Sequence, residues 1–473
     1  MAKGSKGSKP PPPLGPPAPP PPLPPGGAAA GAAGPWPVPA VGKPRPVRLP
    51  TVVDETLANG LRVVLARRPG IPRFECRLHI PVARGAVADP ARMRVMTDTV
   101  LSGTAEWSSR AIAEEMQGLG GGLGADADTE HLIIGGSSLS SYRSRFVALF
   151  GEVLLGAVFP AEEVAIERDR IVQEIALLRS QPGVVARDAL AYRLYGSHPY
   201  GRGTPDPEAV AKVQPAMLRK LFAARAHPEG SILVMVGDLD LDATMVDVAK
   251  AFGGWAGGTS DRDLAAPAVS TPPTLLLLDR PGAVQTNIRV GGLAIPRTDP
   301  TYPALALAVT VFGGAFTSRL NDNIREQKGY TYGAHAGVEH RRTVSQLSIS
   351  ADVGREVTAP SLVEIAYELG RMVSLPVTQV ELDAARRYVQ GTMAMGIQTQ
   401  AGLTSYLAML TSSGLPVAYL RDYPAALEDV TVDDVLSAAQ RYLSPTGLTT
   451  VLVGDAAVVA PAVRPLGQVV SED

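Results

Sequence analysis

The chain has 473 residues, more than one hydrophobic core usually serves, so two or three domains are expected. Its net charge of −2 offers no electrostatic reason to expect nucleic acid as a partner. The single cysteine, Cys76, excludes an intrachain disulfide and a thiolate metal cage, and it is interpreted as a small hydrophobic filler. No window offers about 18 unbroken apolar residues, so no membrane span is predicted.

Residues 1–49 contain 17 prolines together with runs of Gly and Ala, and they are predicted to form a disordered tail. This composition is typical of a solvated spacer, and also of segments that bind aromatic-lined grooves. The tail begins with lysines but lacks a continuous apolar region, so it is not interpreted as a signal peptide. A cytoplasmic location is therefore expected, and a periplasmic one remains open if translation starts elsewhere.

From residue 51 the pattern becomes that of a globular domain. Two strands joined by a turn at Asn59-Gly60 are followed by a third strand within residues 73–87. Helices are predicted over residues 91–101, 108–118, 141–157, 161–181 and 184–196, with Ser108 as a cap and with extended segments before residue 140. A buried strand near residues 230–240 and a helix from about Ala243 complete this part.

The same order of elements then begins again. Four short echoes recur at offsets of 209 to 217 residues, which indicates two copies of a domain of roughly 210 residues. They pair Arg68-Pro69-Gly70 with Arg280-Pro281-Gly282, residues 102–112 with 313–324, Glu130-His131 with Glu339-His340, and residues 233–240 with 450–457. The predicted domains are residues 50–256 and 274–473, joined by a linker at 257–273. Each is expected to be an α+β domain, a mainly antiparallel sheet with helices packed on one face.

Several stretches resemble the pitrilysin/insulinase family of zinc metallopeptidases. They are "LANGLRVVLARRPG", "SGTAEWSS", "ERDRIVQEIALLRSQP" and "HPYGRGTPDPEAV" in the first copy and "FGGAFTSRLNDNIREQKGYTYG" in the second. The resemblance covers residues 50 to 460 and is strongest to the smaller members that work as paired chains, like mitochondrial processing peptidase. It implies the processing-peptidase fold in both domains.

Members of the family that cut peptides carry H-x-x-E-H on a helix, five residues before a Gly-Thr. The resemblance places these positions at Arg94, Thr97 and Asp98, with Glu174 where a third ligand belongs and Glu167 where a second acid often lies. A guanidinium has no lone pair and repels a cation, and a threonine cannot act as the base. Two carboxylates without imidazoles make a poor zinc site, so no cofactor is expected in this chain. Glu167 and Glu174 are instead interpreted as part of a solvated or arginine-paired helix face, in which Arg94 can bridge to Glu174.

Other motifs do not replace this site. The six histidines show no metal-binding spacing, since the two that are closest lie five residues apart and would face opposite sides of a strand. The glycine-rich residues 118–124 lack the Gly-Lys-Ser/Thr of a phosphate loop and are interpreted as a turn or a strand edge. Asp126, Asp128 and Glu130 are predicted to share one strand face, either as a solvated acidic face or beside an edge that a substrate peptide joins.

The second copy contains a different candidate pair, Arg325 and Tyr332 in "IREQKGYTYG". In paired-chain members the subunit without zinc supplies such an arginine and tyrosine. The resemblance therefore implies that both side chains bind the scissile carbonyl and its oxyanion in a partner's active site. Arg325 is expected to end a helix that Gly329 breaks, with Tyr332 on the following strand. The alternative is a surface helix charge and a half-buried strand aromatic.

The sequence is therefore interpreted as the zinc-less, Arg/Tyr-bearing chain of a heterodimeric peptidase. Its expected partners are a homologous zinc-bearing chain and a peptide substrate, with no catalysis by this chain alone. A second hypothesis is a non-catalytic scaffold or binding module, similar to the core subunits of respiratory complexes. A third, an autonomous metallopeptidase, requires ligands that the first copy lacks.

Overall fold

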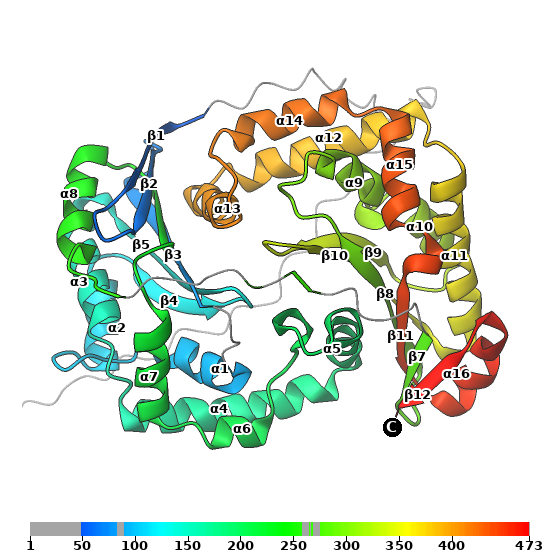
Figure 1. Ribbon diagram of the computed structural model, residues 1–473, viewed down its shortest axis with the longest axis horizontal. Coiled ribbons are helices and arrows are strands. Elements are labelled where there is room, and N and C mark those ends of the chain that lie inside the picture. Colours follow the sequence, from blue (N-terminus) through cyan, green and yellow to red (C-terminus); the bar gives the residue numbers. More distant parts are fainter. Residues whose placement is uncertain (1–48, 83–88, 258–263, 265, 268–274, 473) are drawn as a thin grey trace, which may run out of the picture. The chain divides into compact units, whose positions relative to one another are not determined.

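The computed structural model describes residues 49–82, 89–257, 264, 266–267 and 275–472, apart from the side chains of residues 471 and 472. The predicted tail, except Leu49, and most of the predicted linker lie outside the described residues. Two six-stranded mixed sheets, each with its own set of helices, make up the described chain (Figure 1). The α+β class predicted from the sequence is confirmed.

The first sheet has the strand order β1-β2-β6-β3-β5-β4, and only the β2–β6 pairing is parallel. Buried and polar side chains alternate strictly along β3, which lies inside the sheet. Phe74, Cys76, Leu78 and Ile80 are fully buried, while the residues between them are polar. The strands are β1 (Thr51–Thr56), β2 (Arg62–Arg67), β3 (Arg73–Pro81), β4 (Gly122–Ala127), β5 (His131–Leu139) and β6 (Ile232–Gly237).

The helices of the first half follow the predicted boundaries closely. Ser108 caps α2 through a hydrogen bond from the backbone N–H of Ala111, and Asp89 caps α1 in the same way through Ala91. Proline begins four helices, at the position where its missing N–H costs nothing. The helices are α1 (Pro90–Thr99), α2 (Ser109–Gly118), α3 (Arg143–Leu155), α4 (Ala161–Ser180), α5 (Pro182–Tyr195), α6 (Pro207–Ala211), α7 (Pro215–Arg225) and α8 (Leu241–Phe252), with short turns η1 (Ser140–Tyr142) and η2 (Pro199–Gly201).

The second sheet repeats the first, which confirms the predicted duplication. Its order β7-β11-β8-β10-β9 matches β2-β6-β3-β5-β4 strand for strand and direction for direction. The copies differ at the outer edge, where β1 runs antiparallel to β2 but β12 runs parallel to β7. The strands are β7 (Leu275–Asp279), β8 (Gln285–Ala294), β9 (Ala334–His340), β10 (Ser345–Gly354), β11 (Thr449–Gly454) and β12 (Val469–Glu472).

The helices of the second half include one long apolar stretch, Tyr302–Gln327, built from α9, the π-helical η3, α10 and the π-helical η4. Its length and composition alone would allow a membrane span, but 67% of its apolar window is buried inside the protein, where it packs against α15 and β9. We therefore regard it as a core helix. The elements are α9 (Tyr302–Val309), η3 (Thr310–Gly314), α10 (Arg319–Asn321), η4 (Asp322–Gln327), η5 (Arg355–Val357), α11 (Thr358–Ser374), α12 (Gln379–Gly396), α13 (Gln400–Ser412), α14 (Tyr419–Asp429), α15 (Val432–Tyr442), η6 (Pro445–Gly447), α16 (Ala456–Val463) and η7 (Arg464–Leu466).

Each copy contributes one helix that packs on the sheet of the other copy. Helix α13 of the second copy packs on β3 and β6 of the first sheet, and α5 of the first copy packs on β8 and β11 of the second. Along β2, Val63 and Leu65 belong to the first copy's own core, whereas Val64 and Ala66 belong to the core that includes α13. Each sheet therefore has its own helices on one face and a helix of the other copy on the opposite face.

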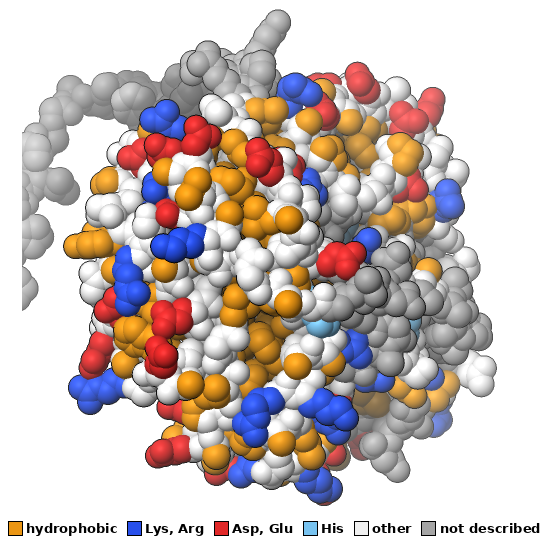
Figure 2. Space-filling view, turned by 60° about the vertical axis from the view of Figure 1, so that its left-hand side comes forward, with side chains coloured by type: hydrophobic (Ala, Val, Ile, Leu, Met, Phe, Trp, Pro, Cys, Tyr) orange, Lys and Arg blue, Asp and Glu red, His pale blue; other side chains and the backbone are white. Residues whose placement is uncertain are grey.

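The surface mixes charges of both signs. Figure 2 shows cationic and anionic side chains interspersed with hydrophobic ones over the face drawn there. Single exposed hydrophobic side chains such as Ile71 and Val246 are normal on the surface of a folded protein. In the second copy, however, several exposed aromatic and aliphatic side chains line one groove, which is described below.

Candidate functional site

The positions that correspond to a zinc motif are brought together between α1 and α4. Arg94 Nε donates to Asp98 Oδ2 at 2.9 Å, one helical turn further along α1. Arg94 Nη2 donates to Glu174 Oε2 on α4 at 2.8 Å. The predicted Arg94–Glu174 bridge is confirmed, and a guanidinium stands where the family's first histidine would lie.

A second arginine, Arg170 on α4, completes this cluster. Its guanidinium donates to Asp98 Oδ2 at 2.8 Å, to Glu167 Oε2 at 2.6 Å and to Glu174 Oε2 at 3.0 Å. Sequence reasoning missed this residue. The signal was present, because Arg170 lies three residues after Glu167 and four before Glu174, where helix side chains are neighbours. We call these five residues, Arg94, Asp98, Glu167, Arg170 and Glu174, the arginine–carboxylate cluster.

Both guanidinium groups of the cluster stay charged. Burial opposes the charged form of Arg94, but the hydrogen bonds and charges of Asp98 and Glu174 outweigh it and raise the pKa of Arg94. The hydrogen bond to Glu167 is the largest cause that raises the pKa of Arg170. Two fixed positive charges are thus held among three carboxylates at any physiological pH.

The residues of the cluster do not fit zinc. Zinc needs donors with free lone pairs, whereas the carboxylates here already accept hydrogen bonds from two cations that would repel the metal. Thr97, at the base position, is 3% exposed and donates its hydroxyl to the Met93 carbonyl at 2.9 Å. Within the described ranges, no group of three or more His, Cys, Asp or Glu side chains is arranged to hold a metal ion.

The two histidines that are closest in the sequence face opposite sides of β9, as predicted. His335 is exposed on β9 while His340 faces the other side of the strand. His340 lies 3.1 Å from both the Tyr302 hydroxyl and Ser345 Oγ, and burial lowers its pKa to about 3. His340 is therefore a neutral structural residue.

The acidic strand face predicted for Asp126, Asp128 and Glu130 is wrong in part. Only Asp126 lies on the edge strand β4, which ends at Ala127. Asp128 accepts hydrogen bonds from the backbone of Glu130 at 2.7 Å, which closes a turn and ends the strand. The Glu130 side chain is half-buried, and its carboxylate accepts from the Tyr200 hydroxyl at 2.7 Å.

The Arg325–Tyr332 segment connects η4 to β9. Arg325 lies two residues before the end of η4, and Gly329 has a positive φ of 65°, as expected for the residue that breaks the helix. The prediction that Tyr332 lies on the following strand is wrong, because β9 begins only at Ala334. Thr331 donates its hydroxyl to the Asp352 carbonyl at 2.8 Å, and this contact bends the chain so that Tyr332 is 98% exposed.

Arg325 is held from two sides. Its guanidinium lies over the Phe316 ring, 4.2 Å from the centroid, and Nη1 is 3.1 Å from Glu326 Oε1. Nη1 is buried and makes this ion pair without the alignment of a hydrogen bond. No hydrogen bond joins Arg325 to Tyr332 in the part of the chain that the structure describes. Each side chain can therefore donate to a ligand independently of the other.

Fold and site together define a two-domain, metallopeptidase-like protein whose metal-motif positions hold an arginine, a threonine and an aspartate. Two family models match it, "Insulinase (Peptidase family M16)" over residues 95–208 and "Peptidase M16 inactive domain" over residues 212–389. Together they cover well over half of the chain. The chain belongs to the M16, or insulinase, family of peptidases.

Some of the similar proteins are described as zinc proteases and others as inactive. An uncharacterized zinc protease of Mycobacterium tuberculosis is 27% identical over 82% of this chain and 90% of its own length. A probable inactive metalloprotease of Bacillus subtilis is 21% identical over 62% of this chain and 68% of its own. The crystal structure of a peptidase M16 inactive domain from Pseudomonas fluorescens superimposes with a TM-score of 0.80 at 25% identity, covering 86% of this chain and 98% of that one.

Proposed function

We propose that this chain is the zinc-less subunit of a heterodimeric M16 peptidase, which pairs with a zinc-bearing chain and binds and orients the peptide substrate. One observation carries the proposal. The metal-motif positions are occupied by the arginine–carboxylate cluster, while Tyr332 is 98% exposed and therefore adds little to the fold. A phenol that exposed is available to a second molecule.

In this arrangement, zinc in the partner chain would supply the activated water, and this chain would supply hydrogen-bond donors. The Arg325 guanidinium and the Tyr332 hydroxyl would donate to the scissile carbonyl, and more strongly to the oxyanion formed from it. The Phe316 ring and the Glu326 carboxylate already contact the Arg325 guanidinium, which lowers the entropy cost of ordering this side chain when substrate binds.

The experiment is to produce this chain with a zinc-bearing homologue and to measure peptide cleavage. We expect Arg325→Ala and Tyr332→Phe each to lower kcat by about 10²–10³. Arg110→Ala and Tyr192→Phe are the matched controls, since both side chains are exposed on helices of the other domain. They are expected to leave kcat unchanged.

Cleavage by this chain alone, or full activity of the complex with both Arg325 and Tyr332 replaced, would contradict the proposal. If the Arg325 and Tyr332 variants leave the function of the complex unchanged and the partner is not a peptidase, the result would favour a scaffold role for this chain.

A further inference from the structure

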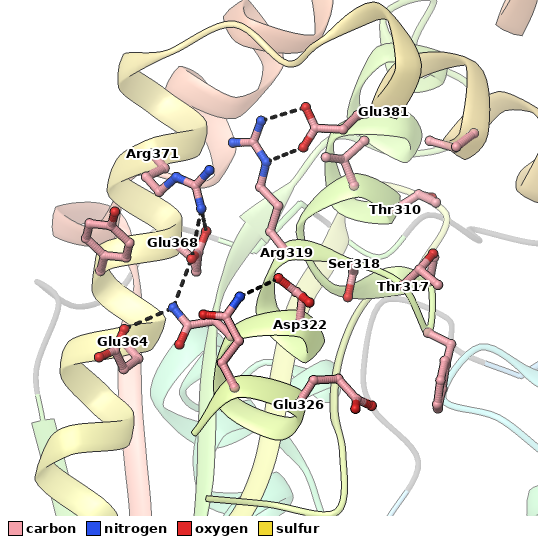
Figure 3. Close-up of a pocket in the computed structure, with 18 of the residues that line it drawn as sticks. Thr310, Thr317, Ser318, Arg319, Asp322, Glu326, Glu364, Glu368, Arg371 and Glu381 are labelled. Carbon is pink, nitrogen blue, oxygen red and sulfur yellow. Dashed lines mark hydrogen bonds and ion pairs between the residues drawn. The ribbon is translucent and has the colours of Figure 1, made fainter. Parts of the chain in front are cut away.

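A groove of about 1020 Å³ lies between η4, α11 and α12 of the second copy. Figure 3 shows Glu364, Glu368 and Arg371 projecting from α11 on one side, with Arg319 and Glu381 paired on the other. Neither Arg325 nor Tyr332 lines it. Phe316 and Glu326, which hold Arg325, do line it, so the groove lies beside the proposed substrate-binding pair without including either side chain.

Ion pairs fix the walls of the groove. Arg319 donates to both oxygens of Glu381 at 2.7 and 3.0 Å, and these hydrogen bonds hold the pKa of Glu381 at about 2. Arg371 donates to Glu368 at 2.9 Å, and Lys328 lies 3.2 Å from Glu364. Such a network keeps the groove from collapsing.

The groove has more negative than positive charge. Five carboxylates and only three cationic side chains line it. Asp322 accepts a hydrogen bond from the neutral amide of Gln327 at 2.7 Å, and no cation pairs with it among the described residues. Glu326 is 57% exposed and is paired with Arg325, which does not line the groove, so among the described residues Asp322 is the lining carboxylate without a cationic partner. A positively charged ligand group would neutralise the excess negative charge of the groove.

Asn323 points to the same kind of ligand. It is 7% exposed and lines the groove, and its Nδ2 donates to Glu364 and to Glu368 at 2.9 Å each. Its Oδ1 is buried and has no hydrogen-bond partner. The amide cannot simply be turned over, because Oδ1 would then face two carboxylates. The acceptor is therefore open to a donor from outside the described chain, either water or a ligand group.

The rim of the groove is apolar. Its exposed members are Phe316 (67% exposed), Val363 (49%), Tyr367 (57%), Val380 (76%) and Tyr388 (47%). Aromatic faces of this kind attract cations and cover the methylene stem of a long basic side chain. Exposed apolar side chains gathered around a charged floor are typical of a protein-binding surface.

We propose that this groove is the docking site for a segment of another protein that presents a lysine or arginine between apolar side chains. The basic group binds the Asn323 Oδ1 and the Asp322 carboxylate, and its apolar neighbours cover the rim. Charge complementarity selects this occupant over an acidic or a purely apolar segment. The docking uses neither Arg325 nor Tyr332, although it shares Phe316 and Glu326 with the surroundings of Arg325.

The test uses the full chain and fluorescence anisotropy with a labelled peptide, Ser-Leu-Phe-Lys-Leu-Ser, and its norleucine analogue. We expect the lysine peptide to bind at least about tenfold more tightly, and to lose affinity as salt is raised. Tyr367→Ala and Asp322→Asn are expected to weaken binding by about three- to tenfold. Tyr192→Ala and Asp169→Asn, exposed residues on α5 and α4, serve as controls and are expected to change nothing.

Equal binding of the two peptides, or wild-type binding by both groove variants, would overturn the proposal. Cleavage of the lysine peptide by the assembled peptidase, lost in the groove variants, would also overturn it, because the groove would then be a substrate subsite. Failure of the Arg325 and Tyr332 variants to affect cleavage would refute only the peptidase role.

Discussion

Removing the Arg94 side chain tests whether a guanidinium has taken the place of the metal. Methionine keeps most of the length and apolar surface of arginine but not its charge, so Arg94→Met isolates the electrostatic part. After the substitution, Asp98 and Glu174 lose their shared cation from α1. They remain within reach of Arg170, at 2.8 and 3.0 Å respectively.

The magnitude follows from burial. Exposed ion pairs contribute about 0–1 kcal/mol, and hydrogen bonds to charged groups about 1.5–3 kcal/mol where water is excluded. The Arg94 side chain is 32% exposed and that of Asp98 is 17% exposed, between these limits. Because Arg170 keeps its contacts, we expect Arg94→Met to lower the free energy of unfolding by about 1–2 kcal/mol.

The assay is urea denaturation followed both by circular dichroism and by tryptophan fluorescence, since coincident transitions are needed for a single free energy. Arg110→Met is the control. Arg110 and Glu114 have the same i,i+4 spacing with a 2.7 Å contact, but their side chains are 87% and 60% exposed. We expect a loss below about 0.5 kcal/mol there. Equal losses in the two variants, or a gain for Arg94→Met, would refute the reasoning.

Three further outcomes are expected. The triple variant Arg94→His, Thr97→Glu, Asp98→His rebuilds the metal motif and should retain about one zinc per chain through dialysis by atomic emission; stoichiometric zinc in the unaltered chain would contradict the cluster's role. Burial lowers the pKa of His79 to about 4. The unfolded chain therefore takes up the proton first, and stability should fall from about pH 6.5 to pH 4, by roughly 3 kcal/mol at most. His79→Gln should flatten that part of the stability curve, and an unchanged slope would exclude His79 as its cause. Burial also raises the pKa of Cys76 to about 12. An aromatic disulfide reagent should then label Cys76 at least about a hundredfold more slowly in the native than in the unfolded chain, and rapid native labelling would disprove its burial.

Local patterns were sufficient for most elements. The helix that begins after Ser108 and the alternation in β3 were predicted correctly because cap chemistry and two-residue periodicity act between near neighbours. The spacing of the echoes predicted two domains because a repeated sequence pattern indicates a repeated structural unit. Tyr332 was misplaced because Thr331 contacts Asp352, some twenty residues away, and the pairing of β9 with β10 begins only at Ala334.

By itself, the sequence determined which chemistry the motif positions lack, since a guanidinium has no lone pair whatever surrounds it. It also determined that the chain is a duplicated α+β protein. Only the tertiary structure decided that Arg170 joins Arg94, that α5 and α13 cross to the other copy's sheet, and that the Asn323 Oδ1 is left without a partner. These features depend on contacts between residues far apart in the chain, whose distances no local pattern encodes.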